Sequence, residues 1–279
     1  MLTRDPIPGA ETHRICHPRS NHCTWTRRIC DTPTYMVSLA PPPRYTVQVM
    51  LPEPAVIDPA VVHAQLLAWR GDVQLIGGAP GEHFGFAIPT EDLPLLAHVF
   101  AAPPDAYAGQ LDDALLWSPS WAERFAAVAR CRSSVVVSMV AHRAINHATM
   151  LLAFLSVLDS VLATVDDVRP TVLHWLPAQR VMPFSTYRLL RMELGPCGPA
   201  INVRIAPAGD HSVADTVGLA ELGLPDLQVL ATGRDPAALT SRLVRLARSM
   251  FVGDKLDCTW VEEASFSPPN RDVLTVQLD

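Results

Sequence analysis

Two residues in the second half of the chain have the types that nucleophilic catalysis uses. His174 lies in the segment TVLHWLPAQR, and Cys197 lies in the glycine- and proline-rich segment GPCGPA. A cysteine attacks as its thiolate, which forms when a histidine or a helix N-terminus lowers its pKa. If the chain is an enzyme, we expect His174 to be the base and Cys197 the nucleophile. The alternative is a neutral, hydrogen-bonded core histidine and a small thiol that fits a tight loop.

Charged residues in the same half are the candidates for binding a protein partner. Arg188 and Arg191 are three apart and share a face of an expected helix, where they could bind an acidic group. Glu262 and Glu263 are neighbours in an expected strand and face opposite sides of it, so at most one could enter a pocket. Solvated surface charges are the alternative for the arginines and the glutamates, whereas the alternative for Asp215 and Asp226 is to shape a turn by accepting hydrogen bonds from backbone amides. The full set of candidates is Arg180, Arg188, Arg191, Asp215, Asp226 and Glu262.

Metal and nucleotide motifs are weak or missing. Cys16, Cys23 and Cys30 are spaced seven apart, whereas structural zinc sites use shorter C-x₂₋₄-C spacings. His142 and His147 are five apart, so they would point to different sides of one helix, unlike the pair in H-E-x-x-H. The chain has no G-x-G-x-x-G, P-loop or G-x-S-x-G motif. We therefore expect no metal and no cofactor.

Composition and charge narrow the class of protein. The chain has 279 residues, 49% hydrophobic content and a formal net charge of −6. A negative chain is not attracted to phosphate backbones, so we expect no nucleic-acid partner. The most apolar stretch, residues 150–164, spans about 15 residues and contains Asp159, so it predicts a buried helix rather than a membrane span. With no apolar signal segment at the N-terminus, we expect a cytoplasmic protein with free thiols.

The order of predicted elements indicates an α+β fold. Residues 1–43 have no helical or strand period, and we expect a disordered or non-native tail there, with Met36 as the alternative start. Residues 44–143 and 169–279 each follow the order β-α-β-β-α-β, and a long apolar helix in residues 144–168 lies between them. This order predicts two tandem ferredoxin-like βαββαβ units packed as one body. A single larger α+β sheet is the alternative.

Two helices have clear boundaries in the sequence. Asp58 followed by Pro59 predicts an N-cap and a first helical position. Asp235 predicts the N-cap of a second helix, and Gly253 predicts its C-terminal end. Leucines along that second helix form one apolar stripe, so we expect it to pack on a sheet.

Part of the second half resembles a known family. The segment DTVGLAELGLPDLQVL, Asp215–Leu230, is similar to the core of a bacterial family, the domain of unknown function 4261, and LHWLPAQR, GPCGPAINVRI and FVGDKLDCTWVEEA resemble its companion segments. The resemblance covers residues 117–279 and is strongest from Leu173 onward. It implies a bacterial cytoplasmic α+β protein. Because no activity is established for the family, it transfers no catalytic residue.

These observations together predict a non-enzymatic binding protein of the bacterial cytoplasm with a protein partner. Some uncharacterised families lie beside secreted toxins, so an immunity-type protein that occludes a toxin is the specific form that we expect. One alternative is an enzyme with a Cys-His or carboxylate site in the groove between the two units. The other alternative is a structural module of a secretion or defence assembly.

Overall fold

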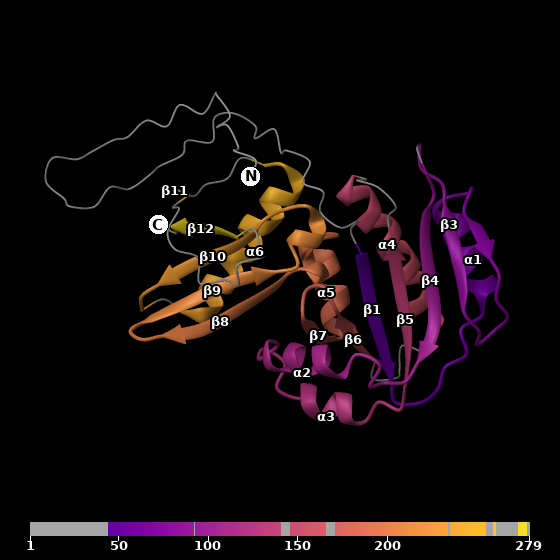
Figure 1. Cartoon of the computed structure of the whole chain (residues 1–279), viewed down its shortest axis with the longest axis horizontal. Helices are drawn as coiled ribbons and strands as arrows, with labels where there is room; N and C mark the ends of the chain where they lie inside the picture. The colour runs from indigo at the N-terminus through magenta and orange to yellow at the C-terminus, as the bar shows by residue number, and fades with distance from the viewer. Residues whose placement is uncertain are drawn as a thin grey trace, which may run out of the picture.

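Two β-sheets and the helices packed on them make up the protein (Figure 1). The structure is a computed structural model that describes residues 44–91, 93–140, 146–165, 171–233, 235–254, 259–260 and 273–277. Within these residues the chain forms twelve β-strands, six α-helices and two short 3₁₀-helices. The α+β class expected from the sequence is therefore confirmed.

The first sheet has seven strands, all antiparallel to their neighbours, in the order β2-β3-β4-β5-β1-β6-β7. The strands are β1 (Arg44–Leu51), β2 (Gln74–Ile76), β3 (Phe84–Ile88), β4 (Leu95–Ala102), β5 (Ser133–Val140), β6 (Val172–Trp175) and β7 (Arg180–Pro183). Val47 of β1 pairs with Val137 on one side and with Trp175 on the other. Because side chains alternate along a strand, Val47 faces one side of the sheet, and Gln48 and Met50 face the other.

Helices cover both faces of the first sheet. Helices α1 (Pro59–Trp69) and α4 (His147–Leu162) pack against each other, and α4 also contacts β4 and β5. On the opposite face, α2 (Ala108–Leu116) and α3 (Arg124–Ala129) contribute to a separate apolar cluster with Met50, Val172 and Val181. Strand β1 is therefore buried on both faces, as its central position in the sheet requires.

The second sheet has the order β11-β12-β10-β9-β8 within the described residues. Its strands are β8 (Asn202–Ala208), β9 (His211–Val217), β10 (Asp226–Ala231), β11 (Thr259–Trp260) and β12 (Val273–Gln277). Helix α6 (Pro236–Val252) packs on β8 and β9, whereas α5 (Phe184–Leu194) contacts β6, β7 and the 3₁₀-helix η1 (Gly198–Ala200). A second 3₁₀-helix, η2 (Ala220–Leu222), contacts α4 and so links the two sheets.

Local capping explains where the clearest helices begin and end. Asp58 Oδ1 accepts a hydrogen bond from the N–H of Ala60 at 2.8 Å, and Pro59 occupies the first position of α1. Asp235 caps α6 in the same way, and Gly253 closes that helix with a φ of 76°. These sequence predictions are confirmed. Asn146 supplies the cap of α4.

The tandem ferredoxin-like arrangement and the linker role of the apolar helix are not confirmed. Strands β6 and β7 extend the first sheet through β1 rather than opening a second unit. The order of elements predicted from the sequence also omitted strands β4 and β7 and helix α2. Helix α4 is a core helix, because most of its residues are buried between the elements that it contacts.

Candidate functional site

His174 lies in the middle of β6 and is fully buried. Its Nδ1 lies 3.4 Å from the side-chain oxygen of Gln48. An amide oxygen only accepts, so Nδ1 carries the proton and donates it to Gln48. The other ring nitrogen, Nε2, is buried and has no hydrogen-bond partner among the described residues. Burial lowers the pKa of His174 to about 4, so the ring is neutral near neutral pH.

Cys197 lies just before η1 and is buried in the larger apolar core. It belongs to the apolar cluster that contains Leu173 and Trp175, whereas His174 shares the opposite face with Val172. Its thiol donates to the carbonyl of Leu194 at 3.7 Å, and burial raises its pKa. The structure gives no hydrogen bond between His174 and Cys197. The lowered pKa makes His174 a weak base, and the raised pKa keeps the thiol of Cys197 protonated, so neither shift favours the base and nucleophile roles.

Arg180, at the start of β7, has its guanidinium turned toward η1. Its Nη1 donates to the carbonyl of Ile201 at 2.7 Å and to the carbonyl of Gly198 at 3.4 Å. Burial lowers its pKa to about 10, so it remains a cation near neutral pH. Among the described residues no carboxylate forms an ion pair with Arg180. In the described part of the chain, the polar contacts of its guanidinium are therefore these two carbonyl groups.

The two arginines of α5 differ in their surroundings. Arg191 forms an ion pair with Asp159 of α4 at 3.0 Å, and Tyr187 donates to the same carboxylate. This contact holds α5 against α4, so the guanidinium of Arg191 is engaged in an ion pair inside the protein. Arg188 lies on the exposed side of α5 with its guanidinium 5.8 Å from the ring centre of Phe184.

The acidic candidates also make internal contacts. Asp215 of β9 forms a bidentate ion pair with Arg204 of β8, whose guanidinium lies 5.3 Å from the ring centre of Trp117. Asp226 is buried at the start of β10 and accepts from the N–H of Leu219 at 3.1 Å, the turn-shaping role that was its alternative. Glu262 lies outside the described residues.

Metal and membrane features can be judged for the described part of the chain. There, no group of three or more His, Cys, Asp or Glu side chains is close enough to hold a metal ion. His147 lies at the start of α4, and its Nδ1 is 3.0 Å from the carbonyl of Glu221. The cysteines of the N-terminal segment and His142 lie outside the described residues. None of the described helices is both long and apolar enough to cross a bilayer.

A polar pocket beside β7 gathers residues that the sequence did not indicate together. It has a cavity volume of about 90 Å³ and is lined by Ser118, Ser120, Trp121, Arg180, Val181, Met182, Pro183, Thr186 and Asn202. These residues come from the loop after α2, from β7, from the first turn of α5 and from β8. Only Arg180 was a candidate beforehand. The serines belong to a helix-start pattern, SPSW, which carries no signal of binding.

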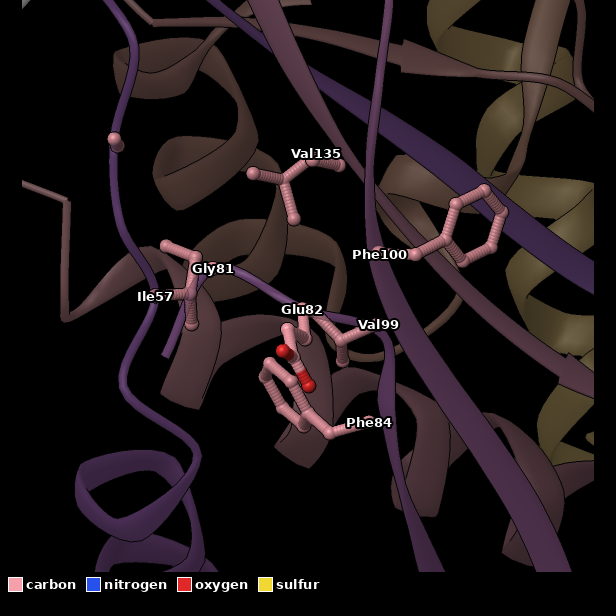
Figure 2. A pocket seen from close by; sticks show the side chains of 9 residues that line it. Ile57, Gly81, Glu82, Phe84, Val99, Phe100 and Val135 are labelled. Carbon is pink, nitrogen blue, oxygen red and sulfur yellow. The ribbon is translucent and has the colours of Figure 1, made fainter. Parts of the chain in front are cut away.

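A second pocket lies near the N-terminal end of α1. It is a small hollow with a cavity volume of about 10 Å³, room for about one water molecule, and it has mostly apolar walls from the segment before α1, from β3, β4 and β5. Figure 2 shows Ile57, Val135, Val99 and Phe84 around this hollow, whereas the ring of Phe100 points away. The carboxylate of Glu82 also lines it.

The outer side of α1 is apolar and exposed. Val61 is 45% exposed and Trp69 is 46% exposed. Their helix carries no charged residue, which is unusual for a helix with an exposed side. The buried side of the same helix, with Val62 and Leu66, is apolar as well. In Figure 1, α1 lies at the end of the molecule farthest from the second sheet.

Comparison with known proteins found no matching family model, no matching curated protein and no matching solved structure. The class that the fold defines is therefore α+β, and the family resemblance stays a prediction.

Proposed function

We propose that the protein is a non-enzymatic binding protein that contacts another protein through the outer side of α1. The observation that carries this proposal is a solvent-exposed helix face without any charge. Ala60, Val61, Ala64, Leu67 and Ala68 share this face and are all exposed; we call these five residues the α1 surface. A helix that is apolar on every side is normally covered on every side. A partner protein would provide the missing cover.

The surroundings of the α1 surface extend its apolar area. Val56, just before the helix, is 71% exposed. Leu75 and Ile76 are exposed on β2, which contacts α1 and forms one edge of the first sheet. The pocket of Figure 2 lies beside Ala55 and Ile57 in the same segment. Because Leu75 and Ile76 are neighbours in a strand and face opposite sides of it, at most one of them borders the α1 surface. Exposed apolar patches are typical of protein-binding sites.

Charge favours a different protein over a second copy as the occupant. Asp58 lies at the start of α1, and Glu82 lies at the neighbouring pocket. The chain as a whole has a net charge of −6, so two copies would repel each other. A partner with an apolar centre and a basic rim complements this surface. An immunity-type bacterial cytoplasmic protein that occludes a basic toxin is the specific form of the proposal.

The first step of the test identifies the partner at the proposed surface. A photo-crosslinking amino acid replaces Leu67 in the full chain, which is then expressed in its native cells. The matched control carries the same amino acid in place of Met192, which is 79% exposed on α5. We expect one protein to be crosslinked at position 67 and not at position 192. The absence of such a crosslink would contradict the proposal.

The second step measures affinity with the purified partner. Leu67→Glu places a charge in the apolar centre of the interface and should raise Kd about tenfold or more, because central apolar contacts carry most binding energy. Met192→Glu adds the same charge on α5 and should leave Kd unchanged. Equal Kd values for the Leu67→Glu and wild-type proteins would refute the site. A concentration-dependent dimer that Leu67→Glu dissolves would instead assign the surface to self-association and overturn the proposal.

The enzyme alternative has less support from the geometry. His174 and Cys197 share no hydrogen bond, and burial lowers the pKa of the histidine and raises the pKa of the cysteine, which gives a weak base and a protonated thiol. If the protein is a binder, Cys197→Ser should leave the affinity for the crosslinked partner unchanged. If the protein is an enzyme at this site, the same variant would abolish turnover.

A further inference from the structure

The pocket beside β7 contains a cation without a carboxylate. Of the described residues that line it, Arg180 alone carries a charge. One nitrogen of its guanidinium, Nη1, is used by the carbonyls of Ile201 and Gly198. Within the described structure, the remaining donors of the fork have no protein acceptor. A partly buried arginine with free donors is a good site for a planar or tetrahedral oxyanion.

Hydroxyl groups add further donors to the same pocket. Ser120 and Thr186 both line it, one from the loop after α2 and one from α5. The described residues offer no hydrogen-bond partner to either hydroxyl. The hydroxyl of Ser118 already has a partner within the protein. Its oxygen accepts a hydrogen bond from the N–H of Val181 at 3.0 Å, and this bond fixes one wall of the pocket.

The first turn of α5 supports the same charge preference. Pro183 precedes the helix and supplies no side-chain cap, and no described carboxylate or hydroxyl is seen to cap this end; the N–H of Phe184 donates to the carbonyl of Thr171 at 3.1 Å, which leaves the next N–H groups of the turn. Pro183 and Thr186 both line the pocket, which places the start of the helix at its wall. The exposed N–H groups of a helix start attract negative charge.

We propose that this pocket binds the phosphate group of a small phosphorylated molecule, with Arg180 as the main ligand and Thr186 and Ser120 as additional donors. The cavity volume of about 90 Å³ has room for a phosphate group. Trp121 supplies an apolar wall for the remainder of such a molecule. The site lies apart from the α1 surface, so it does not depend on the proposed protein-binding function.

Calorimetry with the full chain tests the proposal directly. Inorganic phosphate and O-phosphoserine are titrated, and sodium chloride and acetate at equal ionic strength are the controls. We expect saturable binding of both phosphates, with O-phosphoserine tighter because it also contacts the apolar wall. Binding of acetate with equal or greater affinity would reject phosphate as the ligand class. Tighter binding of inorganic phosphate than of O-phosphoserine would reject a phosphate ester.

Variants assign the binding to the pocket. Arg180→Met should raise Kd by at least about tenfold, since hydrogen bonds to a charged group are worth that much or more. Arg132→Met removes the same charge from an exposed arginine and should leave Kd unchanged. An unchanged Kd in Arg180→Met would overturn the proposal.

A second variant keeps the test decisive if Arg180→Met does not fold. The contacts of Arg180 with η1 could make its loss destabilising, and circular dichroism would reveal this. The double variant Ser120→Ala, Thr186→Val removes both free hydroxyls and nearly preserves volume. We expect its Kd for O-phosphoserine to rise about tenfold. Wild-type affinity in this double variant would overturn the proposal.

Discussion

The side chain of His174 occupies a place where protonation is unfavourable. The ring is fully buried, and one donor bond to Gln48 is its described polar contact. An imidazolium there would lose its hydration without gaining a carboxylate. Gln48 in turn donates to the carbonyl of Pro104 and to Ser134, so the histidine completes a buried polar chain beneath α2.

We predict that His174 makes the protein less stable in mild acid. Its pKa is about 4 in the folded protein and 6.5 ordinarily, so the unfolded chain binds the additional proton as pH falls through 6.5. The stability is complete above that value and is lost progressively down to about pH 4. Between about pH 7.5 and pH 5 the loss is roughly 2 kcal/mol from this residue. Urea unfolding at the two pH values measures it.

His174→Leu separates this effect from other titrating groups. The variant should lose roughly 2 kcal/mol less than wild type over the same interval. His211→Gln, at an exposed position, should behave like wild type. An identical pH dependence in His174→Leu and wild type would contradict a neutral buried His174.

Part of this description of His174 can be predicted from the sequence alone. The alternation of Val172, Leu173 and His174 places the histidine on the opposite face from Leu173, and this is what the structure has. Gln48 lies 126 positions away from His174, so only strand pairing brings it there. Cys197 follows a helix, and its side of the sheet depends on how α5 packs, which no local pattern encodes.

At the scale of elements, Gly218 allows three segments to meet. It follows β9 with a φ of 109°, a conformation that side chains rarely adopt. A Cβ atom there would lie 2.1 Å from the carbonyl oxygen of Ala200 and 3.1 Å from Cβ of Ala178. The end of β9 is therefore in close contact with η1 and with the turn between β6 and β7.

We predict that Gly218→Ala lowers the free energy of unfolding by about 3 kcal/mol or more. The new methyl group would overlap backbone that cannot move without shifting η1, and the positive φ adds strain. Gly209→Ala is the matched control, because Gly209 also has a positive φ of 61° but nothing within 4 Å of the added atom. It should lose only about 1 kcal/mol. Equal losses in urea unfolding would show that the close contact is unimportant.

The sequence predicts best those helices that begin at a capping residue. Asp58 and Asp235 begin helices where expected, since capping is a local interaction. Strand β4 is rich in leucine and alanine, and these residues do not favour strands by themselves. Strand β7 has only four residues and ends in a proline, so it has little period of its own. Both strands exist because neighbouring strands supply their hydrogen bonds.

At the scale of the whole molecule, one apolar core serves both sheets. Tyr45 and Val47 of the first sheet belong to the same buried cluster as Ala214 and Leu227 of the second. Helix α4 contributes many members of this cluster. The hydroxyl of Tyr45 also donates to the carbonyl of Glu221 at 3.0 Å, which ties β1 to η2.

We predict that the described body unfolds in a single cooperative step. A shared core leaves no boundary at which one sheet could open while the other stays intact. Tryptophan fluorescence, to which Trp175 in β6 contributes, and circular dichroism should give coincident urea transitions. Two separated transitions would show that each sheet is stable by itself.

The central place of β1 also governs how the chain acquires its structure during synthesis. Strand β1 leaves the ribosome first among the described strands, yet its two partners, β5 and β6, are made much later. Until then its apolar side chains and both hydrogen-bonding edges have no native cover. Such nascent chains are prone to aggregation and are typical clients of chaperones. Yield of folded protein should therefore depend on chaperone supply and on translation speed between residues 51 and 175.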